Sequence, residues 1–213
     1  MPKITVTRAT LKNHFQYGKW VYLAIAVGGI ALGMLLFDMT EHRARPEHRV
    51  DIELVQGGFA DAEALHDVAA QVLAVGQQKE PLLEEVNFYS VSYTGDPSDV
   101  YGVQKFATMV YAGEGHIWIV PDILFETLIE QGAPMPLDDL ITQNILRPGD
   151  ADLSAFTRST PEDPTERVYA LPATLIPSLT LADYHLQDRC AVILQSCPTP
   201  ELTAVVLQAL MEA

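Results

Sequence analysis

Basic residues are scarce over most of this sequence, and their scarcity excludes one class of partner. From residue 50 to residue 213 the chain has six Lys or Arg against 25 Asp or Glu, a net charge of −19. Nucleic acids and anionic headgroups are bound through positive patches that displace counterions from phosphate. We therefore expect no nucleic-acid partner. A solvated acidic face is favoured over a cation-binding role.

Cysteine is equally scarce, since Cys190 and Cys197 are the only two. Two cysteines are too few for a disulfide framework. If this part of the chain is extracellular, the six residues between them permit a turn-linked bridge. Both could equally be small buried hydrophobic side chains, and no local signature marks either one as a nucleophile.

Motifs that carry catalysis or bind metals are also missing. The sequence has no phosphate-binding glycine loop, no nucleophile elbow and no HExxH. Its six histidines are dispersed, and none has a second ligand at metal spacing. Asp96, Ser98 and Asp99 are interpreted as a turn and helix cap, because they are too few for a calcium loop. We expect no enzyme, no metal and no cofactor.

The longest uncharged stretch, Trp20–Phe37, predicts a transmembrane helix. Its 18 residues, at a rise of about 1.5 Å each, nearly cover the roughly 30 Å hydrocarbon layer of a bilayer. The stretch is longer than the apolar part of a signal peptide, and no small-x-small cleavage site follows it. His42 stands where such a site needs a small residue. We therefore expect an uncleaved signal anchor.

The charges around this stretch predict its orientation in a cell membrane. The first 19 residues carry four basic groups and no acidic one, so the positive-inside rule places the N-terminus in the cytoplasm and the C-terminal domain outside. The expected organisation is a cytoplasmic tail (1–19), a transmembrane helix (20–39), a linker (40–49) and an extracytoplasmic domain (50–213). The lipid bilayer is then the first partner.

Gly29 and Gly33 form a small-xxx-small pattern within the apolar stretch. Such patterns let membrane helices approach closely, so a homodimer through this face is one hypothesis. The alternative is that glycine is simply common in membrane helices.

Alternation of strand and helix patterns after residue 50 predicts an α/β domain with helical crossovers. The expected strands are 50–55, 86–93, 116–120, 168–172 and 191–194. The expected helices are 61–74, 100–111, 122–131 and 198–211. Residues 147–166, rich in Pro, Asp, Ser and Thr, predict a surface loop. The expected fold is a single, mostly parallel α/β sandwich.

The order of these segments resembles the first lobe of extracellular solute-binding proteins of ABC importers. The matching motifs are Val120-Pro121-Asp122, Phe125, Gly132, Pro136-Leu137-Asp138-Asp139-Leu140 and Val168–Pro172. Proteins of that family are about twice as long, because they have a second lobe, and residues 173–189 are too few to form one. The resemblance implies one lobe of a type II periplasmic binding protein, joined here to a membrane helix.

Ligands of open α/β sheets bind at the carboxyl ends of the strands. This rule selects Tyr93, Thr94, Gly95 and Asp96 after one strand, and Asp122 after another. Tyr93 could stack on a sugar, as aromatic residues of the resembled family do, or could cover the sheet edge.

The preferred hypothesis is a non-enzymatic binding or interaction module of solute-binding-protein type, held at the membrane. Its partner would be an envelope protein or a small solute. The alternative is an ABC-importer substrate receptor, for a sugar or another small solute, that completes its cleft by dimerisation.

Overall fold

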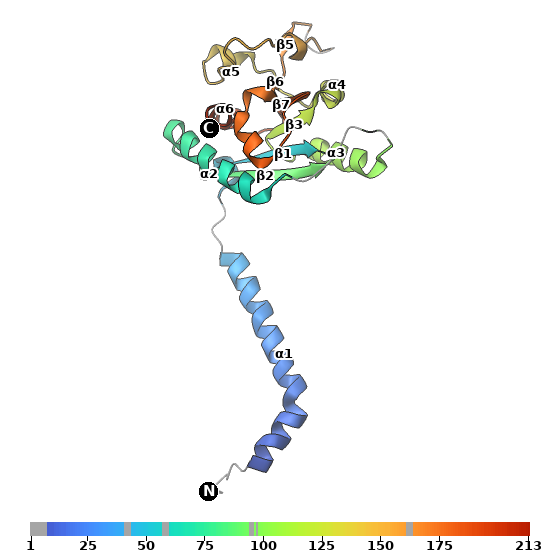
Figure 1. Cartoon of the computed structure of the whole chain (residues 1–213), viewed down its shortest axis with the longest axis vertical. Helices are drawn as coiled ribbons and strands as arrows, with labels where there is room; N and C mark the ends of the chain where they lie inside the picture. Colours follow the sequence, from blue (N-terminus) through green and yellow to red (C-terminus); the bar gives the residue numbers. More distant parts are fainter. Residues whose placement is uncertain (1–7, 41–43, 57–59, 94–95, 97, 161–163) are drawn as a thin grey trace. The chain divides into compact units, whose positions relative to one another are not determined.

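The computed structural model describes residues 8–40, 44–56, 60–93, 96, 98–160 and 164–213 (Figure 1). The side chains of residues 8–17, 38 and 39 are outside this description. The chain divides into two compact units, Met1–Arg43 and Ala44–Ala213, and each is described by itself. The second unit is called the body below.

Helix α1 runs from Arg8 to Thr40, and its central part is long and apolar enough to cross a membrane. The window Gly18–Phe37 has 20 residues and a mean hydropathy of 2.2. At about 1.5 Å per residue, this window spans about 30 Å, the thickness of a hydrocarbon layer. Trp20 and Phe37, near its ends, are 70 % and 69 % exposed. Membrane anchors and signal sequences share these properties.

A five-stranded sheet with the order β2-β1-β3-β7-β6 forms the centre of the body (Figure 1). The strands are β1 (Arg49–Gln56), β2 (Glu85–Ser92), β3 (Ile117–Pro121), β6 (Leu171–Pro172) and β7 (Arg189–Ile193). Strand β1 runs parallel to both β2 and β3, whereas β7 runs antiparallel to β3 and to β6. The predicted α/β class is confirmed. The sheet is mixed, because β7 runs in the opposite direction to the other four strands.

Five α-helices belong to the described part of the body, together with short connecting elements. The helices are α2 (Ala62–Lys79), α3 (Val100–Ala112), α4 (Asp122–Glu130), α5 (Asp138–Thr142) and α6 (Pro200–Glu212). The 3₁₀ helices are η1 (Pro46–His48), η2 (Ser154–Phe156), η3 (Ala173–Leu175) and η4 (Pro177–Ala182). A separate pair of short strands is formed by β4 (Thr157–Arg158) and β5 (Arg167–Val168).

Helices cover both faces of the sheet because side chains of a strand alternate between its faces. Val50, Ile52 and Leu54 of β1 point to one face, where they join a core with residues of α2 and α6. Val55 points to the opposite face and joins a second core with residues of α3 and α4. The body is therefore built from three layers, with one apolar core on each side of the sheet.

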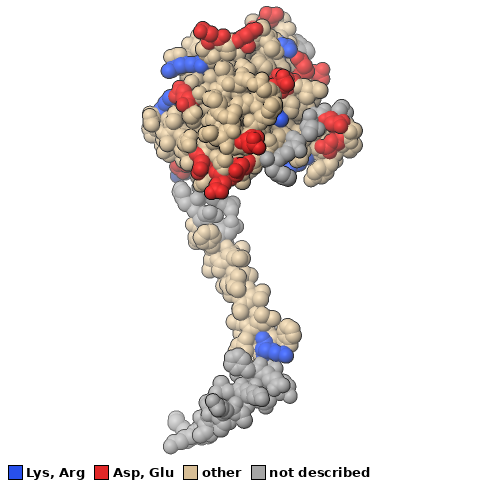
Figure 2. Space-filling view, viewed as in Figure 1, with Lys and Arg blue, Asp and Glu red and all other residues tan. Residues whose placement is uncertain are grey.

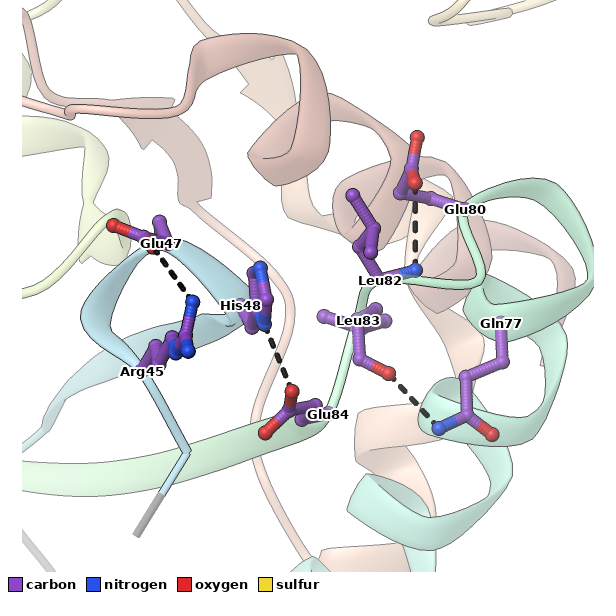
Figure 3. A network of polar contacts seen from close by, with 8 residues as sticks. All are labelled: Arg45, Glu47, His48, Gln77, Glu80, Leu82, Leu83 and Glu84. Atoms are coloured by element: carbon purple, nitrogen blue, oxygen red, sulfur yellow. Dashed lines mark hydrogen bonds and ion pairs between the residues drawn. The ribbon is translucent and has the colours of Figure 1, made fainter.

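The start of the body is bonded to the connection between α2 and β2 (Figure 3). The Glu84 amide donates to the His48 carbonyl at 2.7 Å, and His48 Nδ1 lies 2.8 Å from Glu84 Oε1. Gln77 Nε2 donates to the carbonyl of Leu83 at 2.9 Å, and the Leu83 side chain is fully buried. These bonds hold the beginning of β1 beside the beginning of β2, in the register that pairs Arg49 with Glu85.

The prediction that residues 147–166 form a surface loop is partly wrong. Phe156 lies within it and is only 7 % exposed, and its ring packs edge-on against Phe125 at 5.5 Å between centroids. One aromatic residue in a polar stretch has no periodicity, so the pattern gave no sign of its burial. The expected strand at 168–172 is also divided, because Val168 pairs with β4 whereas Leu171 and Pro172 pair with β7.

Candidate functional site

The carboxyl ends of the parallel strands meet at one edge of the sheet. Strand β1 ends at Gln56, β2 ends at Ser92 and β3 ends at Pro121. Because β7 is antiparallel, its first residue, Arg189, pairs with Pro121 at the same edge. This edge, with the residues around Gln56, Asp122 and Arg189, is the candidate site.

Arg189 and Tyr184 cap the backbone carbonyls at this edge. Arg189 Nη1 donates to the carbonyl of Val55 and, at 3.0 Å, to Tyr184 Oη. Tyr184 Oη lies 3.1 Å from the Val55 carbonyl and 3.2 Å from the Ile119 carbonyl. The guanidinium also lies 4.8 Å from the centre of the Tyr184 ring, within the range of a cation–π contact. Burial raises the pKa of Tyr184, so its hydroxyl stays protonated as a donor.

Asp122 is the first residue of α4, where the helix dipole favours a negative charge. Its amide donates to the carbonyl of Asp188 at 2.9 Å, and its carboxylate accepts a hydrogen bond from the thiol of Cys190. Desolvation and the charge of Asp188 raise the pKa of Asp122, while the Cys190 thiol and Arg189 act in the opposite direction. The edge therefore carries two carboxylates beside one guanidinium.

Gln56 completes the edge at the end of β1. It is 8 % exposed, and its Nε2 has no hydrogen-bond partner among the residues described. A buried amide donor without a partner costs about 1–3 kcal/mol, so such a group needs an explanation. One explanation is a ligand whose acceptor atom binds this donor.

The residues that the sequence analysis selected for the site have different environments in the structure. Asp122 lies at the edge, with the guanidinium of Arg189 close enough to affect its pKa. Tyr93 is 6 % exposed and packs on Phe106 at 5.5 Å, so it belongs to the core rather than to an open surface. Asp96 is exposed, and its Oδ1 accepts from the Ser98 amide at 2.8 Å, which lowers its pKa.

Thr94 and Gly95, which were selected with them, lie outside the described residues. The stacking of Tyr93 on a sugar stays a prediction, and the position of the ring favours the alternative of a residue that covers the sheet.

Sequence reasoning missed Gln56, Tyr184 and Arg189. Arg189 was missed because the expected strand began at residue 191 and its direction was unknown. One signal was present: Arg189 is one of only six basic residues after residue 49, and it directly precedes an apolar run.

The two cysteines do not form a bridge in the structure, where both are free. Cys190 is fully buried in the core on the α3 and α4 face, whereas Cys197 packs against the core on the opposite face. Cys197 Sγ lies 3.0 Å from Thr203 Oγ1. The two sulfur atoms lie on opposite sides of the sheet; Cys190 is buried, whereas Cys197 is only half-buried.

The described residues of this edge do not include a cluster of metal ligands. Across the part of the chain that the structure describes, no group of three or more His, Cys, Asp or Glu side chains is arranged to hold a metal ion.

Comparisons with known proteins gave matches only among solved structures. No protein-family model matches the chain, and no curated protein matches it. An extracellular solute-binding protein family 1 member from Alicyclobacillus acidocaldarius matches 62 % of this chain at 12 % identity, with a TM-score of 0.41. An ABC substrate-binding protein from Listeria monocytogenes, in complex with cycloalternan, matches 57 % at 15 % identity and a TM-score of 0.38.

A third match is the N-glycan transport solute-binding protein of Streptococcus pneumoniae in complex with Man5GlcNAc, at 14 % identity over 59 % of this chain and a TM-score of 0.40. The matched parts cover 29 %, 28 % and 24 % of those three chains, so this chain spans less than a third of their length. The likeness to solute-binding proteins predicted from the sequence is thus found again among solved structures, for part of the fold.

Proposed function

We propose that this chain is a single-pass membrane protein whose acidic outer body is a non-enzymatic binding or interaction module. Its α1 helix would anchor it in the cell membrane with the N-terminus in the cytoplasm. The apolar window Gly18–Phe37 and the four basic residues before Trp20 support this orientation.

The proposed binding role rests on one observation, a buried hydrogen-bond donor at the carboxyl end of β1 without a partner in the described part of the chain. Gln56 Nε2 is buried and without a partner among the described residues, and it lies next to Val55, whose carbonyl is capped by Arg189 and Tyr184. A ligand that presents an oxygen acceptor to Gln56 would satisfy this donor. An envelope protein and a small solute both carry such acceptors.

The chemistry of the edge supports binding rather than catalysis. Burial, together with the nearby Asp122 carboxylate, raises the pKa of Cys190, so its sulfur is a thiol and not the thiolate that a nucleophile requires. The Tyr184 hydroxyl is committed to strand carbonyls. These groups hold the edge in place.

Membrane topology is tested by reporter fusions to the carboxyl end of the full chain. Alkaline phosphatase, which needs an oxidising compartment to form its disulfides, is expected to be active, and green fluorescent protein at the same position is expected to be dark. The reverse pattern would contradict the orientation. Recovery of a body beginning near residue 45 in the soluble fraction would contradict the anchor.

Ligand binding is tested by unfolding the full chain in neutral detergent with oligosaccharides, peptides and divalent cations. A ligand present at 100 times its dissociation constant should stabilise the body by about 2.7 kcal/mol. Gln56→Leu should abolish this gain without lowering the basal stability, because it removes an unsatisfied donor. Gln71→Leu, on the exposed surface of α2, is the matched control. A ligand effect that survives Gln56→Leu would remove Gln56 from the site.

Gly29 and Gly33 remain a proposed contact for a second copy of α1. An added Cβ would meet no atom within 4 Å at either position, so both are open to a partner helix. Gly33→Ile should weaken self-association of the helix in a membrane reporter assay at least tenfold. The same substitution at Gly28 lies on a different side of the helix and is the control.

A further inference from the structure

The acidic residues of β1 form a second polar site, separate from the carboxyl-end edge. Asp51 and Glu53 alternate with Val50, Ile52 and Leu54, which is the pattern of a strand with one solvated face. In the structure both acids are instead buried, at 8 % and 4 % exposure. They point to the same face of the sheet as Val55, the face that carries α3, but they lie nearer the beginning of β1 and outside the apolar core to which Val55 belongs.

A groove of about 550 Å³ lies over this half of the sheet face. Its lining includes Asp51, Glu53, Tyr89, Lys105, Glu114 and His116. Tyr89 stands beside Glu53 because the two residues pair across β1 and β2. The groove thus has a carboxylate floor and one aromatic wall.

Most polar groups on the floor already have partners. The Asp51 carboxylate accepts from Arg49 Nε and from Asn87 Nδ2, both at 3.1 Å. His116 Nδ1 accepts from the Asp51 amide at 2.9 Å, and burial lowers the pKa of His116, so the ring is neutral with its proton on Nε2.

Glu53 is the exception. Its Oε2 is fully buried and has no hydrogen-bond partner within the described part of the chain. The charge of Lys105 acts on Glu53, but no ion pair within 4 Å joins these two described residues. The backbone approaches the carboxylate closely at Gly115, which has a φ of +75° and where a Cβ would lie 2.5 Å from Glu53 Cγ. A buried carboxylate without a partner requires a counter-charge or a proton.

We propose that this groove binds an organic cation, a primary ammonium or guanidinium group, with Glu53 as its counter-ion. Asp51 and Glu114 add negative charge to the lining, and the Tyr89 ring supplies a face for a cation–π contact. The net charge of −19 after residue 49 attracts cations to the body. A metal ion fits less well, because the described residues offer no cluster of three ligands.

Protonation of Glu53 competes with the cation. Burial and the charges of Asp51 and Glu114 raise the pKa of Glu53 to about 7, and Lys105 opposes them. The other titratable or charged groups that line the groove are Arg49, which is paired with Asp51, Tyr89 on β2 and the neutral His116 before β3. Cation binding should therefore weaken as the pH falls from 8 to 5.5.

Calorimetric titration of the full chain in neutral detergent tests the proposal, with 1,4-diaminobutane and arginine amide as probes. We expect binding at pH 8 that weakens at least tenfold at pH 5.5. Glu53→Gln should reduce the affinity at pH 8 at least tenfold and remove the pH dependence. Glu130→Gln, which removes one charge from the exposed surface of α4, should leave the affinity unchanged.

The source of the cationic group is distinguished by a second arm with the peptides Gly-Lys-Gly and Gly-Arg-Gly, capped at both ends. Binding of the free amines alone indicates a small solute, and binding of the capped peptides indicates a basic side chain of a protein partner. Binding that Glu53→Gln leaves intact, no binding of either probe, or tighter binding of Ca²⁺ than of the amines would overturn the proposal. Gln56→Leu leaves this groove unchanged, so its effect separates the two sites.

Discussion

Tyr184 and Glu53 are both buried polar residues, but their partners differ. The Tyr184 hydroxyl has Arg189 and two strand carbonyls within 3.2 Å, whereas Glu53 Oε2 has no partner among the described residues. Neither environment could be predicted from the sequence. An alternating pattern tells which residues share a face, but acids are rarely buried, so the acidic face was expected to be solvated.

Tyr184→Phe should destabilise the body by about 1–3 kcal/mol, because it removes a buried hydroxyl and leaves its partners unsatisfied. Urea unfolding of the full chain, followed by the fluorescence of the fully buried Trp118, measures the change. Tyr111→Phe removes the same hydroxyl from a side chain that is 96 % exposed and should stay within about 0.5 kcal/mol of the native chain. Equal effects of the two substitutions would contradict the role of Tyr184.

Glu53 should make the body less stable as the pH rises. Its pKa is raised from an ordinary value near 4.5 to about 7, so between these values the folded body holds a proton that the unfolded chain has released. Stability should fall across this window, and the loss should be complete above pH 7, at roughly 3 kcal/mol. Glu53→Gln should match the native chain near pH 4 and exceed it by about that amount at pH 8.

The same unfolding assay, repeated without amines between pH 4 and pH 8.5, measures this difference. Subtracting the Glu53→Gln curve removes the contributions to the pH dependence that the two chains have in common. A difference that is constant with pH would show that Glu53 is ionised throughout.

Helices and strands with a strong period were predictable, whereas strand direction was not. Helices α2, α3, α4 and α6 and strands β1, β2 and β3 lie within a few residues of their expected ranges. The period of β7 is the same in either direction, so the sequence could not tell that it turns back and brings Arg189 to the carboxyl-end edge. The two-residue strands β4, β5 and β6 are too short to have a period.

The beginning of α2 depends on one capping residue. Asp61 Oδ1 accepts from the amides of Glu63 at 3.0 Å and Ala64 at 3.4 Å. Asp61→Ala should destabilise the body by about 0.5–2 kcal/mol, measured by urea unfolding, while Asp61→Asn should recover most of the loss. Asp67→Ala, within the same helix on its exposed surface, is the control. A loss no larger than that of the control would exclude a capping role.

At the scale of the whole molecule, charge and apolar residues are segregated along the sequence. The apolar part of α1 bears no acidic side chain, whereas Asp and Glu side chains are distributed over the visible face of the body (Figure 2). This segregation was predictable, because composition alone gives a net charge of −19 after residue 49. How that charge is placed at the strand edges and in the groove depends on tertiary packing, so this placement could not be predicted from the sequence.

Like charges on the body repel one another, so salt should stabilise it. Raising NaCl from 20 to 300 mM shortens the Debye length from about 20 Å to about 6 Å and screens most of this repulsion. The urea midpoint of the full chain should therefore rise with salt at pH 8. A midpoint that falls with salt would indicate that local ion pairs such as Lys79–Glu212, at 2.7 Å, outweigh the net repulsion.

Val50 of β1 and Leu207 of α6 belong to the same apolar core. The ribosome makes the first of these residues long before the second, and at about 5–20 residues per second the interval is roughly 8 to 30 s. During that time the part of the core that α6 completes stays exposed, which favours aggregation. We therefore expect residues 50–55 to be a segment that a chaperone binds on the nascent chain.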